Sequence, residues 1–138
     1  MSDRVYIALG SNLGDRVATL ARAREAIAQV AGITIVRESE IEETDPLGPI
    51  PQGPYLNQMI AIDTTLALRE LLTTLNDIER GAGRVRTVRW SPRTLDLDIV
   101  LVEGTTYSDD ALTVPHPELS KRDFWLRELA ELRGNSDG

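Results

Sequence analysis

The hydrophobic and polar positions along the chain change between strand-like and helix-like spacing. A short apolar run, Val5 to Leu9, predicts a buried strand that ends at a Gly-Ser-Asn turn. Apolar residues then recur at spacings of three and four from Leu20 to Ala31. We expect a helix here, capped by Asn12 or Asp15 and ended by Gly32.

The next part of the chain predicts two strands and a long connection. Residues 33–43 have the β-branched content and the rough alternation of a strand, which ends in Thr44. Residues 45–54 contain four prolines and two glycines, so we expect an irregular segment, either a binding loop or a stiff surface loop. Residues 55–65 alternate again as a third strand. One face of that strand carries Tyr55, Asn57, Met59 and Ala61, and the other carries Leu56, Ile60 and Ile62.

A stripe of leucines and an isoleucine from Leu68 to Ile78 predicts a second helix. Gly81 and Gly83 are expected to end it. Asn76 and Glu79 lie near the C-terminal end of this helix, and we expect both to lie off the apolar stripe.

The last part of the chain predicts a fourth strand, an edge strand and a helix. The fourth strand covers Thr94 to Val102, and Glu103-Gly104 turns the chain. A short edge strand is expected over residues 112–114 and a last helix over residues 118–132. Residues 133–138 are expected to be frayed.

The order strand, helix, strand, strand, helix, strand is the split βαβ pattern. It predicts an α+β fold, a ferredoxin-like βαββαβ sandwich with a four-stranded antiparallel sheet. A C-terminal hairpin and helix extend this core, and residues 1–138 are expected to form a single domain.

Two aspartates near the start of the fourth strand are the first candidate for chemistry. Asp96 and Asp98 are two residues apart, so their side chains project from the same face of a strand, while Leu95, Leu97, Ile99 and Leu101 occupy the other. Two ionised carboxylates side by side repel each other unless a cation lies between them. The pair therefore indicates a metal site, a proton-sharing pair or a solvated strand face.

An arginine-rich segment precedes this strand. Five arginines and no acidic residue lie between Arg80 and Arg93, in a chain whose formal net charge is -7. Guanidinium groups beside a hard cation are what polyphosphate chemistry needs, because Mg²⁺ and arginine neutralise different phosphate oxygens. The alternative is a solubilising basic loop.

Composition narrows the function classes. The 138 residues include no cysteine and one histidine, which excludes disulfides, thiol nucleophiles and clusters of cysteine or histidine ligands. A sequence pI of about 4.7 argues against non-specific binding to nucleic acid. We find no signal peptide or membrane-length apolar run, so we expect a cytoplasmic protein that acts on small molecules.

Several longer motifs resemble one enzyme family. They are Y-I-A-L-G-S-N-L-G-D, P-L-G-P with Y-L-N, G-R-V-R, R-W-S-P-R-T-L-D-L-D-I, and V-P-H-P before Arg122 and Phe124. From Tyr6 to about Leu129 the chain resembles 6-hydroxymethyl-7,8-dihydropterin pyrophosphokinase. The resemblance implies an ATP-dependent diphosphotransferase of folate biosynthesis, which moves the diphosphate of ATP to the hydroxymethyl group of the pterin and releases AMP. It also implies two Mg²⁺ ions.

The resemblance assigns roles to individual residues. Asp96 and Asp98 would hold the Mg²⁺ ions, and Asp98 is also a candidate base for the attacking hydroxyl. Arg84 and Arg93 would stabilise charge on the transferring group, making these two arginines and the two aspartates the catalytic set. The nucleotide would contact Asn76, Glu79, Arg84, Arg86, Arg93, Ile99, Thr113, His116 and Arg122. The pterin would contact Thr44, Leu47, Tyr55, Asn57, Trp90, Asp96 and Phe124, with Tyr55 and Phe124 as the stacking pair and Asn57 reading the ring edge.

Two other classes of function stay open on the sequence. One is a non-catalytic module that binds pterin or nucleotide, and the other is a ferredoxin-like interaction domain whose acidic pair is only solvated. We expect a monomer, with a dimer as the alternative.

Overall fold

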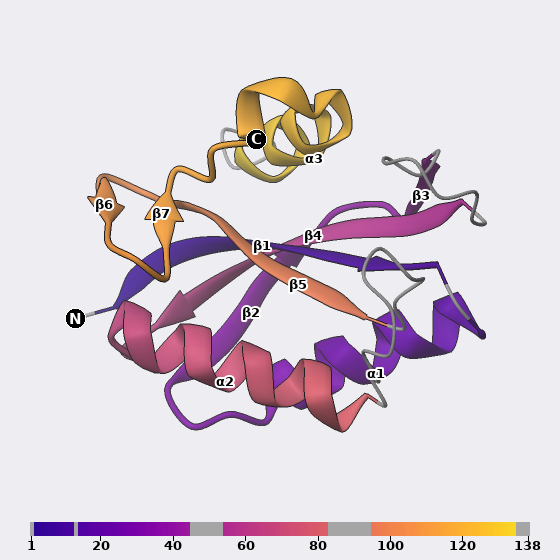
Figure 1. Cartoon of the computed structure of the whole chain (residues 1–138), viewed down its shortest axis with the longest axis horizontal. Helices are drawn as coiled ribbons and strands as arrows, with labels where there is room; N and C mark the ends of the chain where they lie inside the picture. Colours follow the sequence, from indigo (N-terminus) through magenta and orange to yellow (C-terminus); the bar gives the residue numbers. More distant parts are fainter. Residues whose placement is uncertain (1, 13, 45–53, 83–94, 135–138) are drawn as a thin grey trace.

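The computed structural model describes residues 2–12, 14–44, 54–82 and 95–134, which form a mixed α and β structure (Figure 1). Its strands are β1 (Asp3–Ser11), β2 (Ile33–Glu38), β3 (Glu42–Thr44), β4 (Tyr55–Thr64), β5 (Asp96–Val102), β6 (Tyr107–Ser108) and β7 (Thr113–Val114). Its helices are α1 (Arg16–Ala28), α2 (Leu68–Gly81) and α3 (Asp123–Gly134), with a short 3-10 helix at Leu119–Lys121. None of these helices is both long and apolar enough to cross a membrane.

The main sheet has the order β2-β4-β1-β5, and β3 also pairs with β4. Every pairing among the described strands is antiparallel. β1 lies between β4 and β5 and is buried from Val5 to Ser11, so an uninterrupted apolar run is the pattern that this position requires. β6 and β7 form a separate hairpin before α3, so the expected C-terminal hairpin and helix are both present.

The sheet has five strands rather than the four that the sequence predicts, because the second predicted strand is divided. Glu38 pairs with Ile60, and Glu42 pairs with Asn57. The edge strand therefore advances four residues while β4 advances three, so the edge strand contains one extra residue. The extra residue is accommodated around Ser39, whose backbone N–H donates to the Met59 carbonyl and whose hydroxyl accepts from the Met59 N–H, each at 2.9 Å. A rough alternation of residue types does not predict the position of such an extra residue.

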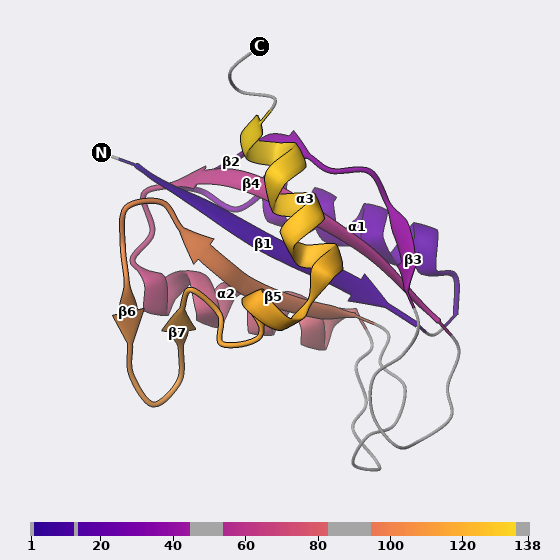
Figure 2. The ribbon, with the colours of Figure 1, turned by 90° about the horizontal axis from the view of Figure 1, so that it is seen from above.

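Helices cover both faces of the sheet. α1 and α2 lie on one face and α3 crosses the other (Figures 1 and 2). The first face is packed with aliphatic side chains such as Ile7, Leu20 and Leu71, which belong to one large cluster. A smaller cluster under α3 includes Met59 and Trp125. The two faces of β4 divide as predicted, because Met59 and Ala61 pack toward α3 while Leu56, Ile60 and Ile62 pack toward α1 and α2.

The predicted faces of the fourth strand hold only as far as Ile99. Leu97 and Ile99 pack toward α1 and α2, but Leu101 packs against the cluster under α3. The cause is a register shift against β1, where Ile7 pairs with Ile99 and Tyr6 pairs with Leu101. Val100 is thus an extra residue in β5, and Val102 takes the place in the core that we expected for Leu101.

Three helix ends differ from the sequence prediction. α1 begins as expected, because the Asp15 carboxylate accepts from the Ala18 N–H at 3.1 Å, but it ends before Ala31. The last helix begins at Asp123 rather than 118, since the extended backbone of Arg122 separates it from the 3-10 helix. It then continues to Gly134, so Arg133 is helical rather than frayed, and its side chain pairs with Glu103 at 3.1 Å.

Candidate functional site

The two aspartates of β5 project from the face of the sheet that α3 crosses. Asp98 lies opposite Ala8 and Asp96 lies opposite Gly10 on β1, and Ala8 belongs to the cluster under α3. The shared face predicted for the two carboxylates is therefore confirmed. The Asp98 side chain is 41% exposed, so it remains accessible to a ligand.

His116 is held close to Asp98 by one hydrogen bond of its backbone and one of its ring. Its backbone N–H donates to the Val100 carbonyl at 2.8 Å, and its Nδ1 accepts from the Glu118 N–H at 3.0 Å. Because Nδ1 is an acceptor, the neutral ring carries its proton on Nε2, which lies 4.0 Å from the Asp98 Oδ1. Burial lowers the pKa of His116, and the charge of Arg122 lowers it further, while Asp98 opposes both. The ring is thus a neutral N–H donor at physiological pH.

Arg122 supplies positive charge beside His116. Its guanidinium lies 4.3 Å from the centre of the Trp125 ring, and the edge of His116 contacts the same ring with centroids 4.9 Å apart. The Arg122 Nε is buried and has no hydrogen-bond partner among the described residues. A buried guanidinium N–H without an acceptor is suited to an anionic group such as phosphate.

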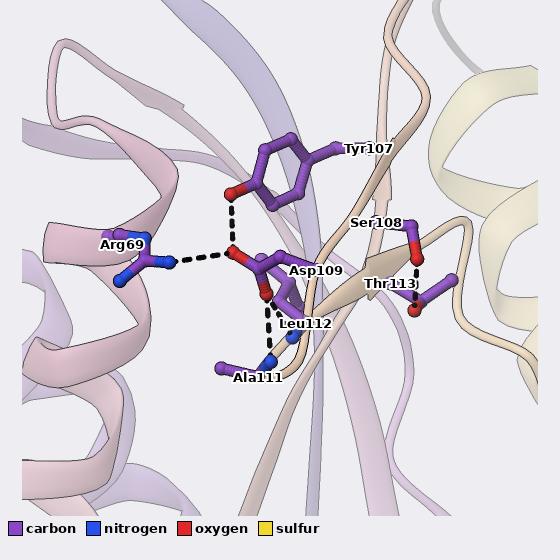
Figure 3. A network of polar contacts seen from close by, with 7 residues as sticks. All are labelled: Arg69, Tyr107, Ser108, Asp109, Ala111, Leu112 and Thr113. Atoms are coloured by element: carbon purple, nitrogen blue, oxygen red, sulfur yellow. Dashed lines mark hydrogen bonds and ion pairs between the residues drawn. The ribbon is translucent and has the colours of Figure 1, made fainter.

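The hairpin that leads to His116 is fixed to α2 through Asp109 (Figure 3). The Asp109 carboxylate accepts from the Tyr107 hydroxyl, from the Ala111 N–H at 2.8 Å and from the Leu112 N–H at 2.9 Å. Arg69 of α2 donates to it at 3.3 Å. The hydrogen bond from Tyr107 and those from the backbone lower the pKa of Asp109, so it stays ionised. Thr113, a predicted nucleotide contact, lies in this hairpin with its hydroxyl 3.1 Å from that of Ser108.

A second group of predicted residues lies on the same face at β3 and β4. Asn57 is buried and donates from its Nδ2 to the Thr44 hydroxyl at 2.5 Å, while Tyr55 pairs with Thr44 in the sheet. Gly10 links this group to the aspartates, because it pairs with Asn57 on one side and with Asp96 on the other. A Cβ on Gly10 would lie 3.3 Å from the Asn57 Oδ1, so glycine leaves that oxygen uncrowded. Phe124, at the start of α3, packs on the cluster beneath that helix.

Three predicted nucleotide contacts lie elsewhere. Asn76 is exposed on α2, and Ile99 is buried in the core between the sheet and α2. Glu79 was expected to lie off the apolar stripe of α2, and this is wrong: it follows Leu71 and Leu75 at spacings of four and is 6% exposed. Its carboxylate accepts from the Leu97 N–H at 2.7 Å, which secures the start of β5 between the two aspartates.

The remaining predicted residues lie outside the described part of the chain. They are Leu47, Arg84, Arg86, Trp90 and Arg93.

Two further residues of this face were missed by sequence reasoning. Gly10 begins the Gly-Ser-Asn sequence that we expected to be a turn, but it lies within β1. Trp125 contacts both His116 and Arg122. Its spacing of three from Arg122, within the helix predicted over residues 118–132, was the available signal.

Comparisons with known proteins show the family of this chain. Residues 6–134 match the family described as 7,8-dihydro-6-hydroxymethylpterin-pyrophosphokinase. The chain is 45% identical over 132 residues to the 2-amino-4-hydroxy-6-hydroxymethyldihydropteridine pyrophosphokinase of Bacillus subtilis. The aligned residues are 96% of this chain and 79% of that protein. The chain is 43% identical over 129 residues to the protein of the same name from Methylorubrum extorquens, with 94% and 82% covered. The folic acid synthesis protein fol1 of Schizosaccharomyces pombe is 36% identical over 127 residues, which are 92% of this chain and 17% of that protein.

Replacing Glu79 by alanine should destabilise the protein by about 1–3 kcal/mol, because the Leu97 N–H loses its acceptor in a buried position. Glu79→Gln keeps an acceptor oxygen and should recover most of this loss. Urea denaturation measures the free energy of unfolding. Asp77→Ala, an exposed carboxylate on the same helix, is the control and should change it by less than about 0.5 kcal/mol. Equal effects of Glu79→Ala and Asp77→Ala would contradict this role of Glu79.

Proposed function

We propose that this chain, which belongs to the 7,8-dihydro-6-hydroxymethylpterin-pyrophosphokinase family, performs its reaction on the face of the sheet that holds Asp96, Asp98 and His116. The chain is a pyrophosphokinase of folate synthesis: it transfers diphosphate from ATP to hydroxymethyldihydropterin, and AMP is the other product. The observation that carries the location is the approach of His116 Nε2 to Asp98 Oδ1 beside the unpartnered Nε of Arg122.

The donor set of this face suits magnesium. Asp96 and Asp98 offer two carboxylates, and among the described residues no group of three or more acidic, histidine or cysteine side chains is arranged to hold a metal ion. Mg²⁺ is commonly held by one or two carboxylates, with substrate phosphates and water completing its octahedron, whereas a cage made only by protein would need more ligands. The family resemblance implies two Mg²⁺ ions, which Asp96 and Asp98 would hold and which would neutralise charge on the phosphate oxygens.

Two hydrogen-bond donors on the described face complement the phosphates. Arg122 brings a guanidinium whose buried Nε lacks an acceptor among the described residues, and His116 brings a neutral N–H. Both donors cost no reorganisation, because Trp125 and the Glu118 N–H already orient them. Arg84 and Arg93 are proposed from the sequence to neutralise the transferring group, with Arg86 and Trp90 closing over it.

The β3 and β4 group would take the pterin. Tyr55 and Phe124 offer two aromatic rings for a flat heterocycle, and Asn57 offers the carbonyl oxygen that its hydrogen bond to Thr44 leaves free to accept. Leu47 is proposed from the sequence to add a backbone contact, and Asp96 lies between this group and the phosphates. The reacting hydroxymethyl group would then face the carboxylates, where Asp98 is the candidate base.

The nucleotide is proposed to extend from this face toward Asn76, Glu79, Ile99 and Thr113. The Leu97 N–H donates to the Glu79 carboxylate, which is buried, so the support that Glu79 gives to this site is its contact with the start of β5. We further propose that the fold is the ferredoxin-like βαββαβ arrangement, that residues 1–138 act as one domain and that the protein works as a monomer. The strand order β2-β4-β1-β5 supports the first of these proposals.

The test of the proposed site is a product analysis. Protein, Mg²⁺, ATP and 6-hydroxymethyl-7,8-dihydropterin are mixed, and AMP and ADP are separated by chromatography. We expect AMP with a pterin diphosphate, and a loss of rate on the order of 10²- to 10³-fold for Asp98→Asn. Asp3→Asn, an exposed aspartate at the start of β1, is the control and should match the wild type. ADP as the product would overturn the reaction. Pterin binding by calorimetry without turnover would favour a binding module.

Gly10→Ala tests the pterin side. The new Cβ would press on the Asn57 Oδ1 at 3.3 Å and contact the Tyr55 ring at 3.6 Å. Crowding of this kind costs about 1–3 kcal/mol, so the KM for the pterin should rise on the order of tenfold while the KM for ATP changes little. Steady-state kinetics measure both constants. Gly81→Ala is the control, because a Cβ there meets nothing within 4 Å. An unchanged KM for the pterin would remove Asn57 from the pterin site.

A further inference from the structure

α3 carries a buried acid that no role above uses. Glu128 is 2% exposed, and neither of its carboxyl oxygens has a hydrogen-bond donor among the N–H and O–H groups described in the structure. An ionised carboxylate in such a place would lose its hydration without compensation. Glu128 therefore needs either a cation or a proton.

The group within reach of Glu128 is another carboxyl. Glu42 of β3 is the side chain that interacts with Glu128, and Arg127, the residue before Glu128 on α3, donates to the Glu42 Oε1 at 2.6 Å. Two carboxyl groups can hydrogen-bond only if one of them carries a proton. Arg127 favours the ionised form of Glu42, so Glu128 is the acid that keeps the proton and donates it.

The electrostatics of the two groups agree with this assignment. Burial raises the pKa of Glu128 to about 9, and the hydrogen bond to Glu42 adds to the effect. For Glu42, burial opposes ionisation, but the hydrogen bonds from Glu128 and Arg127 outweigh it and lower the pKa. The charged groups that act on Glu128 are Glu42 from β3 and Arg127 and Glu131 from α3 itself. The β4 residues under α3, Met59 and Ala61, are apolar.

The pair of Glu42 and Glu128 joins β3 to α3, the strand and the helix that carry Thr44 and Phe124. Glu42 lies opposite Asn57 and shares a face of β3 with Thr44, the hydroxyl that accepts from Asn57. Glu128 follows Phe124 by four residues, so both lie on the same side of α3. The shared proton thus connects the strand that orients Asn57 to the helix that carries Phe124.

We propose that Glu128 and Glu42 are positioning residues for the heterocyclic substrate: their shared proton holds α3 against β3 and sets the distance between Phe124 and the Thr44–Asn57 pair. This inference rests on the proposed function, because it takes Phe124 and Asn57 as parts of the pterin site. The link itself is a property of the fold and can be observed without the substrate.

The link has a defined dependence on pH. The folded protein keeps the Glu128 proton up to about pH 9, whereas the unfolded chain releases it near the ordinary glutamate value of 4.5. The folded state binds more protons within this window, so the contribution of Glu128 to stability is complete below it and declines as the pH rises through it. Above the window the two carboxylates repel each other, and of this link only the ion pair between Arg127 and Glu42 remains.

Two variants of Glu128 test the proposal. E128Q keeps a neutral donor and acceptor of the same shape, so at about pH 7 its KM for the pterin should stay near the wild-type value. Toward about pH 9.5 the KM of the wild type should rise, whereas the KM of E128Q should not. E128L fills the space but cannot donate, so the same KM should rise on the order of tenfold at each pH, with kcat and the KM for ATP little changed. E25Q, which removes an exposed carboxylate from α1, is the control and should follow the wild-type profile.

Thermal unfolding without substrate gives an independent reading. The Tm of the wild type should fall relative to that of E128Q as the pH rises from about 5 to about 9. A parallel pH profile of wild type and E128Q, in Tm or in the KM for the pterin, would overturn the shared proton. An unchanged KM for the pterin in E128L would overturn the positioning role. If the wild type itself formed no AMP, the proposed function would fail instead, and calorimetric pterin affinities of the same variants would decide the positioning role.

Discussion

The antiparallel register of β1 is the constraint on which the site depends. β1 is buried on both faces and pairs with β4 on one side and β5 on the other, so its position decides which residues of those strands become neighbours. Gly10 brings Asn57 and Asp96 together across one strand. Because side chains alternate along a strand, a slip of one residue would turn the aspartates into the apolar core and expose leucines in their place. The burial of Ile7 and Leu9 resists such a slip.

One face of the sheet forms the larger apolar core, and the other face carries the polar residues of the proposed site. The face under α1 and α2 is packed with aliphatic side chains, and its buried glutamate, Glu79, accepts from a backbone N–H. The face under α3 is packed only in part, and the polar groups of the site lie on it with their partners already placed. A rigid apolar layer on one side therefore allows the other side to hold charges close together, which binding of a polyphosphate requires.

Local patterns predicted those parts of the structure that depend on neighbours in sequence. The strand period placed Asp96 and Asp98 on one face, and the apolar stripe located α2, since both follow from backbone geometry. The bulge at Val100 and the division of the edge strand at Ser39 depend on the partner strands, so residue types along the chain do not report them. Glutamates in helices are usually solvated, and only the tertiary structure shows that Glu79 and Glu128 are not.

The protonated acid on α3 also changes the charge of the native molecule. The formal net charge of -7 counts every glutamate as ionised, so a neutral Glu128 leaves the folded protein at -6 near pH 7. The unfolded chain recovers the missing unit by releasing one proton to the solvent. Folding and proton uptake are thereby linked, and the native protein migrates more slowly toward the anode than its composition implies.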